Sequence, residues 1–284
     1  MTRPSVVFLL PALILSAPLW CQQQVASASL PDSPAPHGLA GEAPDPGPGG
    51  EAFHRHGYPT GREESFRALP LDFLHDQKEV WGVFPGQVAK GHHWVPVLAT
   101  AGITAGLLYA DPHVMTYFRN HEKNLSDLNS TFSSYISAGE IAAVPVGLLL
   151  VGAARHDPYQ TSTAWLGADA YADSAIPPLV IKAIARRERP SQVPVNTPFQ
   201  DEFFKNSWYG GSSFPSGHAA AAFSVATVVA SRYRNHVWAP VLAYGMATVI
   251  GLSRITGREH YPSDVFVGSV IGVTTAEFAA LRPR

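Results

Sequence analysis

A histidine and an aspartate stand four residues apart where two apolar runs meet, at His260 and Asp264. Pro262 between them suits the first position of a helix, so His260 is expected just outside a helix start and Asp264 in the first turn. From there the carboxylate can reach back and hold the imidazole in one tautomer, as a nucleophilic or proton-transferring histidine requires. Arg254, at the end of the preceding apolar run, adds a cation, although a cation in a last helical turn is also common for structural reasons alone.

A second segment, Pro215-Ser216-Gly217-His218, has the residue types of a helix start. Ser216 can cap the helix, and a purely structural interpretation needs nothing more. The same geometry also suits an anion, because a helix start offers free backbone N–H groups and the positive end of the helix dipole. Gly217 permits close approach, and His218 stands one residue away as a proton donor.

A third segment, 182–190, concentrates basic residues at the end of an apolar run. Cations at the carbonyl end of a helix are common, and for this segment taken alone that explanation is preferred. Helical spacing nevertheless predicts that Lys182, Arg186 and Arg189 share one face. Guanidinium groups together with an ammonium match what a phosphate requires.

Helices must position these segments, because the apolar residues recur at helical spacing without strand-like alternation between the runs. We predict an all-α fold, a compact antiparallel bundle of about six core helices with extra short helices. The apolar runs lie at 94–110, 137–154, 161–185, 216–232, 237–254 and 262–281. If neighbouring helices alternate in direction, all three segments meet at one end of the bundle, which is then the active site. The connection 111–136 should reach that end and form part of a rim.

The three segments together resemble the signature of the type 2 phosphatidic acid phosphatase and vanadium haloperoxidase superfamily. The matching residues are Lys182 with Arg189-Pro190, then Pro215-Ser216-Gly217-His218, then Ser253-Arg254 with His260 and Asp264.

The resemblance implies a role for each matching residue. His260 would attack phosphorus and become a phosphohistidine, while Asp264 orients its imidazole. His218 would protonate the leaving alcohol and later activate water. The implied phosphate cradle consists of Lys182, Arg189, Ser216, Gly217 and Arg254.

Fixed cations and N–H donors can stabilise the charge of a transferring phosphoryl group, so we expect a phosphomonoesterase without metal or cofactor. A vanadium-dependent haloperoxidase is the first alternative, disfavoured because such relatives are generally much larger than 284 residues. Gain of bromide oxidation on adding vanadate would support it. A catalytically silent binding protein is the second, disfavoured because the acid, the nucleophile and the cradle are all present. It would bind phosphate esters without turnover.

The composition and the N-terminus indicate an exported protein. A formal net charge of −2 argues against nucleic-acid binding. Residues 1–28 have the features of a signal peptide, with Arg3, an apolar run over 6–20 and the small residues Ala26-Ser27-Ala28. Cys21 is the only cysteine and falls inside this segment, so the mature chain would hold no disulfide.

Residues 29–62 are rich in Pro and Gly and are expected to be a disordered linker, which leaves 63–284 as the helical domain. Near the start of that domain Leu71, Leu74, Lys78 and Trp81 recur at helical spacing. They predict a short amphipathic helix that ends before Pro85 and covers the bundle or, as a second option, lies on a membrane surface.

Localisation depends on whether the helices lie in lipid. The apolar runs are mostly shorter than the ~20 residues of a spanning helix, and acidic residues interrupt them at Glu140, Asp169 and Asp173. Arginines at the end opposite the site favour an integral inner-membrane protein instead. Six spans after an exported linker would place the site in the cytoplasm, whereas lipid phosphatases of the resembled family usually face outward. We therefore prefer a soluble or peripheral periplasmic enzyme.

The loop 191–211 carries aromatic side chains at Phe199, Phe203, Phe204, Trp208 and Tyr209. They either pack the loop down, which we prefer, or form an apolar entrance for a lipid tail. The predicted substrate is accordingly a small phosphate ester or, as the alternative, a phosphatidate or isoprenoid phosphate. The sequence indicates neither the natural substrate nor the oligomeric state.

Overall fold

The computed structural model describes residues 69–121, 134–200, 203–206 and 212–282. The chain divides into two units, Met1–Tyr58 and Pro59–Arg284, and all described residues belong to the second. The predicted signal peptide and linker lie outside the described residues. Within the described ranges every regular element is a helix, which confirms the all-α prediction.

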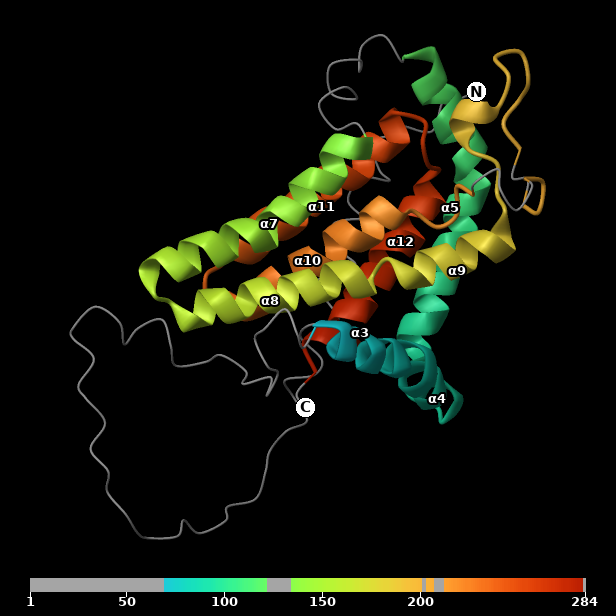
Figure 1. Ribbon diagram of the computed structural model, residues 1–284. Helices are drawn as coiled ribbons and strands as arrows, with labels where there is room; N and C mark the ends of the chain where they lie inside the picture. Colours follow the sequence, from blue (N-terminus) through green and yellow to red (C-terminus); the bar gives the residue numbers. More distant parts are fainter. Residues whose placement is uncertain (1–68, 122–133, 201–202, 207–211, 283–284) are drawn as a thin grey trace, which may run out of the picture. The chain divides into compact units, whose positions relative to one another are not determined.

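The helices follow one another along the chain, mostly with short connections, although the long segment 186–216 separates α9 from α10 (Figure 1). The α-helices are α3 (Leu69–Lys78), α4 (Phe84–Ala89), α5 (Trp94–Asn120), α7 (Ser134–Arg155), α8 (Pro158–Asp173), α9 (Ile176–Ala185), α10 (Gly217–Arg232), α11 (Trp238–Thr256) and α12 (Pro262–Thr275). Two π-helices, η2 (Glu79–Val83) and η5 (Ala276–Ala280), continue α3 and α12, and a 3₁₀ turn, η4 (Pro190–Gln192), follows α9.

Prolines lie within several helices or their first turns, and this corrects three sequence-based boundaries. Helix α5 continues through Pro112 to Asn120, so residues 111–120 are helical and not part of a rim connection. The chain remains helical past Pro85, which lies in the first turn of α4. The run 161–185 is two helices, because α8 ends at Asp173 and α9 begins with Pro177 in its first turn. Proline lacks an N–H and is tolerated in a first turn, where that N–H has no helical partner.

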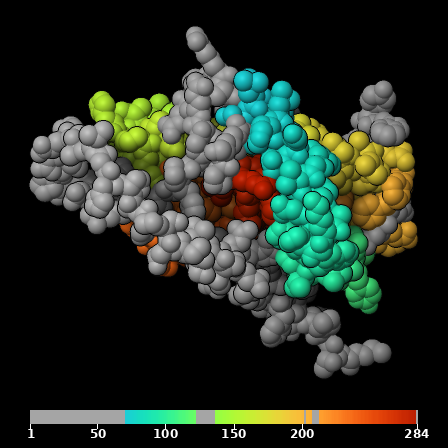
Figure 2. All heavy atoms as spheres, turned by 90° about the horizontal axis from the view of Figure 1, so that it is seen from below, coloured from blue at the N-terminus to red at the C-terminus, as the bar shows by residue number. Residues whose placement is uncertain are grey.

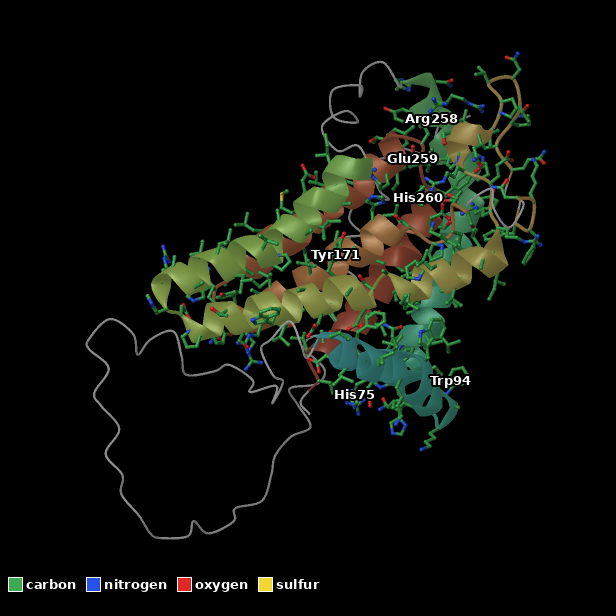
Figure 3. The ribbon with its side chains drawn as sticks, viewed as in Figure 1. His75, Trp94, Tyr171, Arg258, Glu259 and His260 are labelled. Carbon is green, nitrogen blue, oxygen red and sulfur yellow. The ribbon has the colours of Figure 1, made fainter. Side chains whose placement is uncertain are left out.

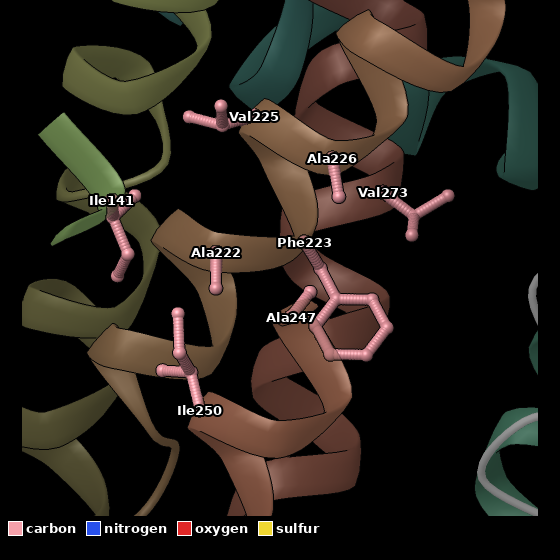
Figure 4. Packing of buried hydrophobic residues seen from close by; sticks show 8 residues of the cluster. All are labelled: Ile141, Ala222, Phe223, Val225, Ala226, Ala247, Ile250 and Val273. Carbon is pink, nitrogen blue, oxygen red and sulfur yellow. The ribbon is translucent and has the colours of Figure 1, made fainter. Parts of the chain in front are cut away.

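Helix α10 forms the centre of the bundle and packs against α7, α8, α11 and α12. Its sequence is rich in alanine, so neighbouring helices can approach its backbone closely. Buried apolar side chains from four helices interdigitate around it (Figure 4), namely Ile141, Ala222, Phe223, Val225, Ala226, Ala247, Ile250 and Val273. Because such packing is dense, the start of α10 is held in a defined position relative to α11 and α12.

Two glycines let α12 lie directly on the backbone of α10. A Cβ atom at Gly268 would be 2.3 Å from the carbonyl oxygen of Ser216, and one at Gly272 would be 2.2 Å from that of Ala220. Real side-chain atoms do not approach so closely, so both positions require glycine. Their spacing of four residues puts both on one helix face, as in other close helix pairs.

Helix α3 packs on α8 and η5 with its acidic face, which is the reverse of the predicted orientation. Asp76 is 1% exposed, whereas Leu71 and Leu74 are 71% and 65% exposed. Gln77 fixes this orientation, because its Nε2 donates to the carbonyl and the carboxylate of Asp173 at 3.3 and 3.2 Å. The apolar stripe of α3 therefore faces away from the bundle. Figure 2 shows α3, in cyan, at the surface of the molecule.

Candidate active site

The three chemically interesting segments meet at one end of the bundle, as predicted. The turn that carries His260 and Glu259 lies at the opposite end of the helices from Trp94 (Figure 3). Backbone hydrogen bonds join the segments: Ser216 N–H donates to the Asp264 carbonyl at 2.9 Å, and Ser213 N–H donates to the Arg187 carbonyl at 2.8 Å. The ends of α9 and α11 and the starts of α10 and α12 therefore form one connected site.

The environment of His260 determines which of its ring nitrogens is available for chemistry. Nδ1 lies 2.7 Å from the carbonyl oxygen of Ser213. A carbonyl only accepts hydrogen bonds, so Nδ1 carries the proton and the lone pair is on Nε2. Burial lowers the pKa of His260 to about 4, against the opposing effect of Asp264, and the nearby Lys182 charge adds to the lowering. At neutral pH the imidazole is uncharged and nucleophilic at Nε2.

Asp264 supports His260 from a longer distance than the sequence suggested. Its Oδ2 is 3.7 Å from His260 Nδ1, so the Ser213 carbonyl makes the short contact that fixes the tautomer. Asp264 Oδ2 also accepts from the Ser213 hydroxyl and, at 2.8 Å, from the Tyr261 N–H. This carboxylate thus caps α12 while it faces the imidazole, and its charge is in place to stabilise a cationic histidine.

Lys182, in the last turn of α9, points toward the same carbonyl groups. Its Nζ donates to the carbonyl oxygens of Ser212 at 2.7 Å and Ser213 at 3.4 Å. An ammonium has three N–H donors, so one remains for an anion. Burial and, to a smaller extent, the charge of Arg189 lower the pKa of Lys182 to about 8, against the opposing effect of Asp264.

The predicted shared face of Lys182, Arg186 and Arg189 is wrong, because α9 ends at Ala185. Arg186 adopts a left-handed conformation with φ 43° and its N–H closes the helix on the Lys182 carbonyl at 3.1 Å. The turn sends Arg187 inward and carries Arg189 to a half-buried position, where it forms an ion pair with Glu259, the residue before His260.

Arg254 contributes its backbone as well as its charge. It is 2% exposed, and its Nε and Nη2 donate to the Ser253 hydroxyl at 3.2 and 3.1 Å. Its carbonyl accepts from the N–H groups of Glu259 and His260 at 2.9 and 3.2 Å. These two bonds fix the turn that presents His260.

The start of α10 has the features expected of an anion-binding helix end. Ser216 is the N-cap residue, and its hydroxyl accepts from the Ala219 N–H at 3.4 Å. Among the described residues, apart from its chain neighbours and its own helix backbone, no heavy atom lies within 4 Å of a Cβ built on Gly217, which suits close approach of a ligand to the backbone. His218 follows in the first turn and is half-buried, which suits a group that exchanges protons with a substrate.

Two features that position the site were missed by sequence reasoning. Arg187 is fully buried between Asp111 and Asp264, at 2.8 and 2.7 Å from their carboxylates. An acidic residue inside the otherwise apolar stretch of α5 was the available signal. The second feature is the pair Gly268 and Gly272, whose Gly-x-x-x-Gly spacing is visible in the sequence.

Most of the described aromatic side chains of the loop 191–211 pack inward, in line with the preferred prediction. Phe199 is buried against Tyr261 and beneath the guanidinium of Arg119, and Phe203 lies against Phe214. Phe204 is exposed. Trp208 and Tyr209 lie outside the described residues.

Comparisons with known proteins give one family and several relatives. The model of the PAP2 superfamily matches residues 164–282. A lipid A 1-phosphatase of Porphyromonas gingivalis is 39% identical over 67 residues, which are 23% of this chain and 15% of that protein. A decaprenylphosphoryl-5-phosphoribose phosphatase of Mycobacterium tuberculosis is 39% identical over 116 residues, 39% of this chain and 56% of that protein.

Among solved structures, the transmembrane PAP2 type phosphatidylglycerolphosphate phosphatase of Bacillus subtilis is similar, with a TM-score of 0.39 and 17% identity over 75% of this chain and 92% of that chain. The matches to the two curated relatives span only 15% and 56% of their lengths.

Proposed function

This chain belongs to the PAP2 superfamily, and we propose that it is an integral-membrane phosphatase that hydrolyses a lipid phosphate ester through a phosphohistidine intermediate. The observation that carries the proposal is the hydrogen bond from His260 Nδ1 to the Ser213 carbonyl at 2.7 Å. It leaves the lone pair on Nε2, within a cluster of cations and helix starts that suits a phosphoryl group. We assign to this site the residues that the sequence pattern singled out.

In the first step, Nε2 of His260 attacks phosphorus and forms an N–P bond as the P–O bond to the leaving alcohol breaks. His218 gives its proton to the leaving oxygen. His260 becomes cationic as its N–P bond forms, and the Asp264 carboxylate at 3.7 Å stabilises that charge.

In the second step, neutral His218 takes a proton from water, and the water oxygen attacks phosphorus. The N–P bond breaks, inorganic phosphate leaves, and His260 regains its lone pair. In both steps the charge on the equatorial phosphoryl oxygens is stabilised by the cradle, composed of Lys182, Arg189, Arg254, Ser216 and Gly217.

A location in the membrane is supported by three helices, α5, α7 and α11, that are long and apolar enough to cross a bilayer. The 27 residues of α5 extend about 40 Å at 1.5 Å per residue, more than the ~30 Å hydrocarbon thickness of a bilayer. The shorter runs inferred from sequence had favoured a soluble enzyme, because the run that begins at Trp94 was expected to end at 110. The structural lengths favour the membrane alternative instead.

The surfaces of these helices support the same conclusion. Large apolar side chains point outward along α5 and α11, among them Val95, Leu98, Tyr109, Val241, Leu242 and Met246. The outward stripe of α3, with Leu71 and Leu74, adds to this apolar surface. Exposed apolar area on this scale is typical of a surface covered by lipid or protein. Relatives named for lipid-linked phosphate substrates favour lipid.

The first test is fractionation and turnover of the full chain. We expect the protein to remain with membranes after washing with high salt and to require detergent for extraction. In mixed micelles, kcat/KM for a phosphorylated lipid should exceed that for p-nitrophenyl phosphate by at least about tenfold, because apolar tail contacts add binding energy. Release without detergent, or equal rates on both substrates, would contradict the lipid assignment.

The second test addresses the chemistry. Rapid quenching at alkaline pH should trap phosphate on wild-type protein, and His260→Ala should trap none and hydrolyse neither substrate. His236→Ala, which removes a histidine from the turn between α10 and α11, serves as the matched control and should behave as wild type. Wild-type rates in His260→Ala would exclude the mechanism.

A further inference from the structure

We propose that Arg187 and Asp111 are positioning residues that hold Asp264 in the orientation needed for phosphoryl transfer to His260. The inference rests on the proposed function and extends it to two residues that do not belong to the recognised motifs. Asp111 also lies before residues 164–282, the range matched by the family model. All three side chains, Arg187, Asp111 and Asp264, are 0% exposed, and the charged groups of Arg187 and Asp111 are engaged with each other and with Asp264 and Ser263, so we assign both residues to positioning and not to substrate contact.

The guanidinium of Arg187 bridges the carboxylates of Asp264 and Asp111. Its Nη1 donates to Asp264 Oδ1 at 2.7 Å and to the Ser263 hydroxyl at 2.8 Å. Its Nη2 donates to Asp111 Oδ2 at 2.8 Å. A planar guanidinium with donors in fixed directions can make these bonds together, whereas the single ammonium of a lysine cannot reproduce their geometry.

This arrangement gives the two oxygens of Asp264 different tasks. Oδ1 is occupied by Arg187, and Oδ2 accepts from Ser213 and Tyr261 and faces His260 Nδ1. Rotation of the carboxylate would break bonds on both sides. The oxygen that faces the imidazole is therefore fixed in place before any charge develops on His260.

Asp111 holds the Nη2 group of Arg187 and also the start of α12. Its Oδ1 accepts from the Ser263 N–H at 3.1 Å, and its Oδ2 accepts from the Ser263 hydroxyl. The Ser263 N–H is one of the first-turn donors that have no partner inside a helix, so Asp111 caps α12 from a different helix. Because His260 lies just before α12, this contact from α5 fixes the start of the helix that positions His260.

Aromatic rings restrict the guanidinium further. The ring centroid of Tyr261 lies 3.8 Å from Arg187 Cζ, and that of Phe203 lies 4.9 Å away. Stacking of this kind favours arginine over lysine and limits rotation of the plane. The position of Asp264 is thus determined together by Asp111 in α5, by Arg187 in the turn after α9 and by Ser213 in the loop before α10.

A purely structural role is the competing explanation, since a buried ion cluster can serve stability alone. The two roles differ in what they predict for kinetics. A structural defect lowers the amount of folded protein and leaves each folded molecule with normal turnover. A positioning defect lowers kcat in molecules that remain folded and bind substrate normally.

The test compares Arg187→Lys and Asp111→Asn with a matched control, Arg232→Lys, in purified full-length protein. Arg232 is also a buried arginine, with its Cζ 3.9 Å from the Tyr159 ring centroid and its Nε donating to Thr163 at 3.1 Å. It lies at the other end of α10 from Ser216, away from the site. All three substitutions alter buried polar contacts, but only Arg187 and Asp111 belong to the hydrogen-bonded cluster that includes Asp264.

We expect Arg187→Lys to lower kcat about 100-fold, as a misplacement of roughly 1 Å does, with KM within about threefold of wild type. Asp111→Asn keeps the side-chain size and should lower kcat about tenfold, since Arg187 still holds Asp264 Oδ1 directly. The double variant should be no slower than about the Arg187→Lys single variant, because the two residues act through the same carboxylate. Arg232→Lys should lose thermal stability without loss of kcat per folded molecule.

Several outcomes would overturn the inference. Wild-type kcat in both Arg187→Lys and Asp111→Asn, or fully multiplicative losses in the double variant, would show that these residues do not act through Asp264. If Arg187→Lys does not fold, the Asp111→Asn kcat decides alone. Failure of the proposed function is recognised separately, because then the wild-type protein hydrolyses no phosphate ester or His260→Ala remains active, and the inference falls with it.

Discussion

The close contact between α10 and α12 leads to a prediction that can be worked out from distances. Replacing Gly268 by alanine puts a Cβ atom 2.3 Å from the carbonyl oxygen of Ser216 and 3.2 Å from Ala219 Cβ. A carbon and a carbonyl oxygen normally approach to no less than about 3.3 Å. The two helices must therefore separate by roughly 1 Å at this point, the difference between those two oxygen distances.

The consequence is both structural and catalytic. Overpacking of this kind costs about 1–3 kcal/mol. Ser216 caps the helix that carries His218, and its N–H donates to the Asp264 carbonyl at 2.9 Å. Separation at Ser216 thus moves His218, to which we assign the proton transfer, away from His260. A misplacement of about 1 Å lowers the rate roughly 100-fold, so we expect Gly268→Ala to lower kcat by about that factor and to reduce the melting temperature.

Two other glycines provide matched controls. Gly272→Ala makes an equally close contact, 2.2 Å from the Ala220 carbonyl, but about 6 Å farther along the helix axis from the site. It should destabilise the protein to a similar extent with a smaller loss of kcat. Gly245 lies in α11, and no heavy atom of the described residues outside its own helix backbone and chain neighbours lies within 4 Å of a Cβ built there. Alanine at this position should stabilise the helix by about 0.5–1 kcal/mol.

Thermal unfolding and steady-state turnover of the three variants on one phosphate ester complete the experiment. A Gly268→Ala protein with the wild-type melting temperature and kcat would refute the reasoning, because it would show that the space between α10 and α12 can hold an additional methyl group. Equal losses of kcat in Gly268→Ala and Gly272→Ala would refute the link between this contact and the position of His218.

Two further predictions concern protons. The value of kcat/KM should fall as pH drops through about 4, because the pKa of His260 is lowered to about 4 and the protonated imidazole has no lone pair. It should also fall as pH rises through about 8, where Lys182 loses the charge that faces the phosphate, and a profile flat from pH 7 to 10 would contradict the assignment of Lys182. His218→Ala should lower kcat by about 10²–10⁴ on an alkyl phosphate and by less on p-nitrophenyl phosphate in the first, phosphorylating step, because nitrophenolate leaves without a proton. Equal burst rates for the two substrates in His218→Ala would argue against its role as the acid.

The sequence alone was sufficient for the parts of the site that are local in the chain. Ser216 caps α10 and Pro262 opens α12 as predicted, because helix starts depend on a few adjacent residues. The convergence of the three segments was also predicted, from the expectation that neighbouring helices of a bundle run in opposite directions. The all-α fold and the family resemblance rest on the same local patterns.

Tertiary contacts decided which buried residues support the site residues. The sequence could not show that Arg186 leaves the helix and Arg187 turns inward, because that turn is stabilised by the Ser213 N–H and the Ser212 hydroxyl, more than twenty residues away. Nor could it pair Asp111 with Ser263 across 152 positions. These contacts exist only after the helices have packed.

The same distinction explains the membrane question and the orientation of α3. Periodicity shows that a helix has an apolar stripe, but not what covers that stripe. In α3 the bonds from Gln77 to Asp173 turn the stripe outward, and in α5 burial of Asp111 and Met115 accompanies a helix that continues past Pro112. The sequence by itself singled out the residues to which we assign the chemistry and predicted that helices carry them. Only the packed structure decided how long those helices are, which faces they expose and which buried groups hold Asp264 against His260, because these depend on contacts between residues far apart in the chain.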